Sequence, residues 1–196
     1  MKMTSFNING RAVSRLSING REVSFKQEPV VSCDALCFTA EEPGSTVQLT
    51  KVKSAPDVNL QTSTDGGSWT PYTVGDTITL ANVHDKVYFK AVRSNSVMGS
   101  STSNYNKFVM TGKIAASGNV NSLLEEDEYT ARTMSLAGKN FCYSSMFLGC
   151  QSLTQAPELP ATTLANSCYA NMFSNCTSLT QAPELPATTL ADSCYR

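Results

Sequence analysis

The sequence has little charge and lacks any long apolar run. Charged residues make up 16% of the 196 residues, and the formal net charge is −1. It has no basic run of the kind that follows a phosphate backbone, so we expect no nucleic-acid partner. Its apolar runs all fall short of the roughly 18 residues of a membrane-spanning helix, so we expect no membrane span. Hydrophobic residues still reach 41%, which with the low charge favours a β-rich protein over a charge-covered helical one.

The N-terminal stretch "MKMTSFNINGRAV" lacks the apolar region of a secretory signal peptide. Three origins fit this pattern: a cytosolic protein, a protein released by lysis such as a phage component, or a chain whose signal has been removed. The starting Met1 favours the first two.

The familiar catalytic motifs are missing as well. The sequence contains no Gly-rich phosphate loop, no H-E-x-x-H and no G-x-S-x-G. The one histidine, His84, is expected in an exposed turn, and Asp85 beside it does not make a catalytic triad. We therefore predict no catalytic residue and no cofactor, and we expect a protein that is not an enzyme.

A ten-residue repeat opens the chain. The stretch "INGRAVS" at residues 8–14 recurs as "INGREVS" at residues 18–24. Asn-Gly between alternating apolar residues predicts tight β-turns at 9–10 and 19–20, which would join three short strands into a meander. So few strands carry too little core to be stable alone. This segment, 1–28, is therefore either an extension of the next sheet or an attachment module that docks onto a larger assembly.

Residues 29–116 read as a β-sandwich. Short runs rich in Val, Ile, Thr, Tyr and Phe recur about every ten residues, separated by turn sequences such as "EEPG", "DGG" and "NVHD". Trp69, just after the "DGG" turn, is expected either in the core or as a surface on which a ligand stacks. From the alternation of apolar residues we expect these side chains to face inward: Ile78, Leu80, Val83, Val87, Phe89 and Ala91.

Residues 117–196 repeat with a period of 26. Cys142, Cys168 and Cys194 keep this step, as do paired Met, Phe and Leu positions around them. A period of 26 lies in the leucine-rich-repeat range. The four-residue spacing of Cys168, Met172 and Cys176 predicts a helical face, whereas Pro183 and Pro186 predict an extended stretch. We expect a solenoid of α/β coils in which each copy completes its neighbour's core, and we expect its last, partial coil to be frayed or covered by a partner.

The cysteines and the acidic run need no metal. Five of the seven cysteines fall at repeat positions, where they would pack as small apolar residues, although disulfides between neighbouring coils would form in an oxidising place. Cys33 and Cys37 form a C-x3-C pair without the second pair that zinc needs. The "EEDE" run at 125–128 is expected to be a solvated cap.

These repeats resemble a known family. The stretch "MFSNCTSLTQAPELPATTLANSCY" is similar to the BspA-like leucine-rich repeats found in surface and virion proteins of gut Bacteroidales and their phages, and "STDGGSWTPYTVGDTITL" and "FVMTGKIAASGNV" resemble sequences that precede such repeats. The resemblance covers residues 35–196. It implies display on a cell or virion surface and adhesion, with no defined catalytic site. The N-terminal repeat lies outside it and more weakly resembles the anchors of phage fibre proteins.

We therefore predict a mainly β chain: a β-hairpin meander (1–28), an Ig-like β-sandwich (29–116) and a short leucine-rich-repeat solenoid (117–196). The expected function is that of a bacteriophage virion protein, head-fibre or tail-associated, on the virion surface; the alternative is a bacterial cell-surface adhesin or carbohydrate-binding protein. Expected partners are other virion proteins, a host-surface glycan or protein, and further copies of the chain in a homo-oligomer such as a trimer. The predicted anchor residues are Ile8, Asn9, Gly10, Ile18, Asn19 and Gly20. The candidate ligand contacts are Trp69, Gln155, Glu158, Gln181 and Glu184.

Overall fold

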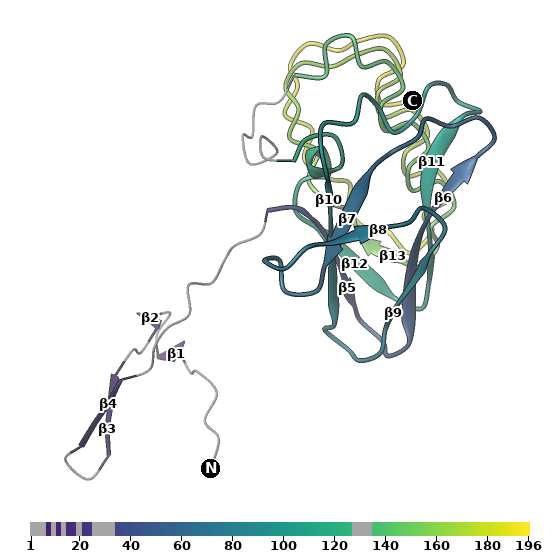
Figure 1. The fold of residues 1–196 in the computed structure, drawn as a ribbon. Coiled ribbons are helices and arrows are strands. Elements are labelled where there is room, and N and C mark those ends of the chain that lie inside the picture. Colours follow the sequence, from purple (N-terminus) through teal and green to yellow (C-terminus); the bar gives the residue numbers. More distant parts are fainter. Residues whose placement is uncertain (1–6, 9–10, 13–14, 19–20, 25–33, 127–134) are drawn as a thin grey trace. The chain divides into compact units, whose positions relative to one another are not determined.

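A computed structural model describes residues 7–8, 11–12, 15–18, 21–24, 34–126 and 135–196 of the chain (Figure 1). The chain divides into two compact units, Met1–Ser32 and Cys33–Arg196. The expected division at residues 28 and 116 stays a prediction. The described part of the chain is mainly β. None of its helices is long and apolar enough to cross a membrane.

The N-terminal unit forms hairpins instead of one meander. Strand β1 (Asn7–Ile8) pairs with β2 (Arg11–Ala12), and β3 (Arg15–Ile18) pairs with β4 (Arg21–Ser24), both antiparallel. The pairings Ile8↔Arg11 and Ile18↔Arg21 leave two residues to close each hairpin. The expected middle strand is thus divided between two separate sheets. The predicted turn residues Asn9, Gly10, Asn19 and Gly20 lie outside the described residues.

Two sheets build the second unit. The larger has the strand order β13-β12-β5-β10-β7-β8, and the smaller has the order β11-β6-β9. All pairs are antiparallel except β12 with β13. The bounds are β5 Leu36–Ala40, β6 Ser45–Val52, β7 Leu60–Ser63, β8 Thr70–Tyr72, β9 Thr77–Leu80, β10 Lys86–Ala91, β11 Tyr105–Thr111, β12 Ile114–Ser117 and β13 Leu153–Gln155.

The two sheets pack through aromatic rings. Phe38 on β5 meets Phe108 on β11 with 4.8 Å between ring centroids, and Phe89 on β10 lies 5.3 Å from Phe108. Edge-to-face contacts at such distances are the favoured geometry for aromatic pairs. The inward alternation predicted for β10 is confirmed, because Val87, Phe89 and Ala91 are all buried.

One expected core residue on the preceding segment lies outside. Leu80 is buried and Ile78 packs against the core, but Val83 is 42% exposed. Strand β9 has already ended at Leu80, and the chain then turns, with the Asp85 carboxylate accepting the N–H of Asn82. The alternation therefore stops before it reaches Val83.

The repeats contain no α-helix within the described residues, so the expected helical face is wrong. Residues 141–149 and 167–175 instead form runs of turns (Figure 1). Every fourth residue has a left-handed backbone: the φ angles are 59°, 58° and 77° at Phe141, Ser145 and Gly149, and the same pattern returns 26 residues later. In a run of four-residue turns, side chains four residues apart point to the same side, as they nearly do in an α-helix. The spacing of Cys168, Met172 and Cys176 thus could not distinguish the two.

Backbone hydrogen bonds alternate along these turns. Even-numbered residues bond within their own turn, as Ser144 N–H does to Phe141 C=O. Odd-numbered residues bond to the next copy, as Tyr143 N–H does to Cys168 C=O and Ser145 N–H to Ala170 C=O. Successive copies are thereby stacked in register along the chain.

Identical side chains stack in the same register. Tyr143, Tyr169 and Tyr195 form a column with 5.5 Å and 5.7 Å between ring centroids and nearly parallel planes. Phe147 and Phe173 stack in the same way, 5.5 Å apart. The five repeat cysteines are all buried with free thiols, as the apolar-packing interpretation predicted.

The sheets cover the first copy. Phe108 N–H donates to Met146 C=O, Met98 N–H donates to Cys142 C=O, and the Phe108 ring stacks on Phe147 at 5.5 Å. One hydrophobic core runs without a break from Leu36 to Cys194. The 3-10 helix Val120–Leu123 is buried in it, followed by Glu125, whose carboxylate lies 3.8 Å from Lys139 Nζ. Asp127 and Glu128 of the acidic run lie outside the described residues.

The last copy is tied down but little covered. Ser167, Tyr169 and Asn171 donate to the carbonyls of Asp192, Cys194 and Arg196, so the expectation of a frayed end is wrong. Leu185 and Leu190 are 46% and 66% exposed, whereas Leu159 and Leu164, one repeat earlier, are 3% and 9% exposed. Coverage by a partner stays a prediction.

Candidate functional site

The structure brings two of the predicted contact residues into one groove. Glu158 and Glu184, one repeat apart, line a groove of about 370 Å³. Its other lining residues are Ala156, Pro157, Leu159, Pro160, Pro183 and Pro186. Both glutamates are exposed. Gln155 and Gln181 are also exposed, but they are not among the residues that line the groove.

The backbone on the Glu158 side of the groove is held in place by hydrogen bonds. Glu158 N–H donates to Gly118 C=O, and Glu158 C=O accepts from Val120 N–H. These two bonds fix its backbone to the segment after β12. Gly118 in turn packs directly against the Ala35 carbonyl, which a Cβ there would overlap. The glutamate side chain is left free to face the groove.

Trp69 is not among the residues that line this groove, and it immediately precedes β8 of the larger sheet. It is half-buried and outside the core, so the expectation that it packs in the core is wrong. Lys90 Nζ lies 4.9 Å from its ring centroid, a cation–π distance. The charged Lys90 already occupies one side of the ring.

Asp65 shapes the turn that leads to Trp69. Its carboxylate accepts the backbone N–H of Ser68, the hydroxyl of Ser63 and the N–H of Gly67, in addition to the Ser68 hydroxyl. These bonds hold the pKa of Asp65 well below its usual value. This carboxylate therefore stabilises the turn at residues 63–68.

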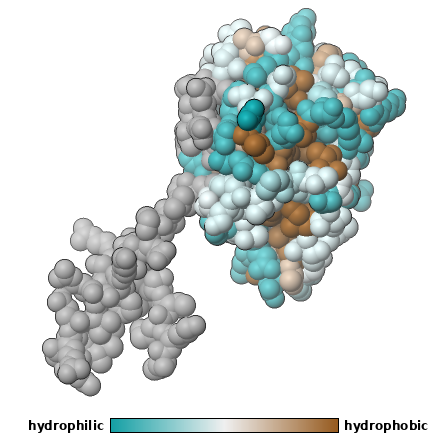
Figure 2. All heavy atoms as spheres, in the orientation of Figure 1, coloured by the Kyte–Doolittle hydropathy of each residue, from teal (hydrophilic) through white to brown (hydrophobic). Residues whose placement is uncertain are grey.

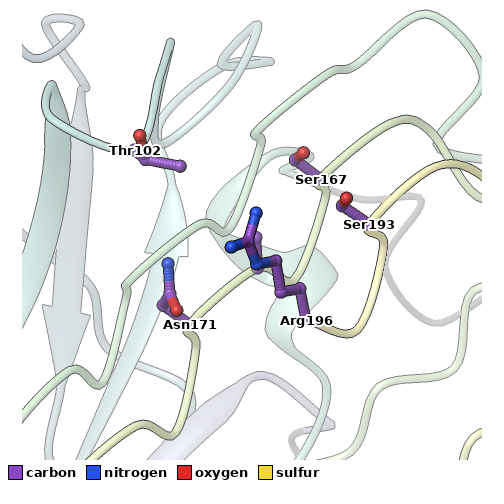
Figure 3. A pocket seen from close by; sticks show the side chains of 6 residues that line it. Thr102, Ser167, Asn171, Ser193 and Arg196 are labelled. Carbon is purple, nitrogen blue, oxygen red and sulfur yellow. The ribbon is translucent and has the colours of Figure 1, made fainter.

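A second, polar pocket was not predicted from the sequence. Thr102, Ser167, Ala170, Asn171, Ser193 and Arg196 surround about 250 Å³. Figure 3 shows the Arg196 side chain between Asn171 on one side and Ser167 and Ser193 on the other. Ser167 and Ser193 are equivalent repeat positions with left-handed backbone. The available signal was their 26-residue spacing, but nothing in the sequence indicated that Thr102 would join them.

Apolar side chains also reach the surface. Figure 2 shows them gathered in strips between polar residues on one face of the second unit. A third pocket, of about 370 Å³, has an apolar lining that includes Leu159, Phe173, Leu185 and Tyr195. It lies beside the lightly covered last copy.

Potential metal ligands do not cluster among the described residues. Within residues 34–126 and 135–196, no three His, Cys, Asp or Glu side chains are grouped to hold a metal ion. The predicted anchor residues Ile8 and Ile18 lie in β1 and β3 of the N-terminal unit.

Comparison with known proteins found no matching family model, curated protein or solved structure.

Proposed function

We propose that this chain is a bacteriophage virion protein, head-fibre or tail-associated, that acts by binding and not by catalysis. The observation that carries the proposal is the division into a small hairpin unit, Met1–Ser32, and a large unit with one continuous core, Cys33–Arg196. The hairpin unit attaches the chain to the particle, and the large unit faces outward toward a host or mucosal surface.

The proposal includes a finer assignment of the large unit. Its two sheets form an Ig-like β-sandwich, and its repeats form a short solenoid of the BspA-like leucine-rich-repeat class. Two observations support this: the sheets pack face to face through Phe38 and Phe108, and hydrogen bonds link copies 26 residues apart. A stack of identical copies presents the same side chains at regular steps, which suits a large or repetitive partner.

Electron microscopy with gold-labelled antibodies against the chain tests the proposal. Purified phage particles and uninfected bacteria that carry the gene are compared side by side. Label on particles is the expected result. Label on the surface of uninfected cells, with none on particles, would overturn the proposal in favour of a bacterial adhesin.

The anchor role has its own test in the same system. Replacing Ile8 and Ile18 with Asp should remove the chain from particles, because both residues lie in the paired strands of the hairpin unit. The near-ultraviolet circular dichroism of the large unit should not change. Particles that retain the variant at the normal level would show that attachment lies elsewhere.

A further inference from the structure

The groove between the proline-rich segments remains open because of its sequence. Pro157 and Pro160 in one copy face Pro183 and Pro186 in the next. Proline has no backbone N–H and so cannot donate to a neighbouring strand. Among the described residues, no backbone hydrogen bond joins 156–160 to 182–186. The turn runs of the same two copies are, by contrast, firmly bonded to each other.

The groove combines an apolar lining with two carboxylates. Leu159 and the prolines supply apolar surface, and Glu158 and Glu184 supply the charge. Both glutamates are exposed, and neither forms an ion pair with a described residue. The surface is therefore acidic without an internal counter-charge.

Glu158 and Glu184 occupy equivalent positions in successive copies, and both line the same groove. Two like charges at one groove repel each other, more strongly the closer they lie. A single cation between them would relieve this repulsion and interact with both.

We propose that this groove binds a lysine or arginine side chain of a protein partner. The aliphatic part of that side chain lies along Leu159 and the prolines, and its charged end lies between Glu158 and Glu184. Lysine and arginine commonly bury their methylene groups along apolar surface while the charged end stays in water. The inference rests on the proposed binding function and specifies the chemistry of the partner.

Titration of the 15N-labelled full chain with three short peptides tests the inference. The probes are acetylated, amidated (Gly-Lys)3, (Gly-Arg)3 and the uncharged (Gly-norleucine)3, followed by NMR at low ionic strength. We expect the lysine and arginine peptides to shift the amide signals of the non-proline groove residues, Ala156, Glu158, Leu159 and Glu184. The norleucine peptide should bind about fivefold more weakly or worse. It cannot form the two exposed ion pairs with Glu158 and Glu184, each of which contributes about 0.5 kcal/mol.

Two double variants separate the groove from overall charge. Glu158→Gln with Glu184→Gln should raise the Kd of the lysine peptide about fivefold or more. Glu42→Gln with Asp76→Asn removes the same charge from a half-buried and an exposed site elsewhere and should leave the Kd within about twofold. Both variants keep side-chain size, and unchanged amide spectra elsewhere would show that they fold.

Three results would overturn the inference: equal weakening in both double variants, shifts that map away from the groove, or no binding of either cationic peptide. Binding of a neutral glycan in the groove instead would also count against it. None of these outcomes bears on where the chain resides, which the gold-labelling experiment decides separately.

Discussion

At the scale of the residue, equivalent positions in the repeats meet different surroundings. Tyr143, Tyr169 and Tyr195 stack in one column. The Tyr143 hydroxyl donates to Asn121 Oδ1 at 2.9 Å, but the buried hydroxyls of Tyr169 and Tyr195 have no partner among the described residues. The difference arises because Asn121 precedes the repeats and has no counterpart in the later copies. A repeated side chain therefore need not make a repeated contribution to stability.

Phenylalanine substitutions should reveal this difference. Tyr143→Phe should lower the free energy of unfolding by about 1–2 kcal/mol, since it breaks a buried hydrogen bond and leaves Asn121 without its partner. Tyr169→Phe should cost nothing or stabilise slightly, because it removes an unpaired buried hydroxyl. Urea unfolding followed by circular dichroism measures both. Equal losses in the two variants would contradict the assignment.

The buried thiols predict a loss of stability at high pH. Burial raises the pKa of Cys168 from 9.0 to about 11, and burial with the nearby Cys176 raises that of Cys150 to about 12. The folded state thus holds these protons more tightly than the unfolded chain does. Their contribution is complete below pH 9 and is lost as the pH rises through 11 to 12.

Urea midpoints measured at pH 8, 9 and 10 should therefore be level at first and then decline. Buried tyrosines such as Tyr143, whose pKa is also raised by burial, act in the same direction. A Cys150→Ala, Cys168→Ala variant should decline less steeply above pH 9. A midpoint that rises with pH would be inconsistent with buried thiols.

At the scale of the element, the runs of four-residue turns explain both the success and the failure of prediction. The period of 26 and the buried repeat cysteines follow from sequence alone. The turn conformation does not, because a four-residue apolar spacing suits a helix equally well. Strand formation does not follow from the sequence either. The letters "LTQ" form the strand β13 at Leu153–Gln155, where β12 pairs with them, but the same letters at 179–181 form no strand. Pairing partners decide such cases, and they are distant in sequence.

The same limit applies to the candidate sites. Glu158 and Glu184 could be predicted to share a surface because they differ by one repeat. Thr102 could not be predicted beside Ser167, since no periodicity links the loop before β11 to the turns. The apolar ring of Trp69 suggests a core position, but the ring lies outside the core with Lys90 of β10 over it.

A comparison of Gly and Ala at one turn position distinguishes left-handed turns from a helix. Ser167 has φ 54°, a conformation that costs L-residues about 1 kcal/mol but costs glycine almost nothing. Ser167→Gly should therefore be more stable than Ser167→Ala by about 0.5–1 kcal/mol. In a helix the order would be reversed by a similar amount. Chemical unfolding of the two variants gives the sign directly.

At the scale of the whole molecule, the sheets serve as the cap of the first repeat. Phe147 of that repeat stacks on Phe108 of β11, which in turn contacts Phe38 and Phe89 of the other sheet. The repeats share one core with the sheets. Neither the sheets nor the repeats bury all of their apolar surface alone, so each depends on the other for stability. The segments that looked separate in sequence are expected to unfold together.

Two built-in reporters test this coupling. Trp69, the only tryptophan, reports on the sheets by fluorescence, and the tyrosine column reports on the repeats by near-ultraviolet circular dichroism. The two urea transitions should coincide, as they do when a single core unfolds cooperatively. Phe108→Ala should shift both by the same amount, about 3–5 kcal/mol, because the ring lies where the sheets meet the repeats. Two separate transitions, or a Phe108→Ala effect confined to one reporter, would mean that sheets and repeats are stable independently and that the first repeat needs no cover.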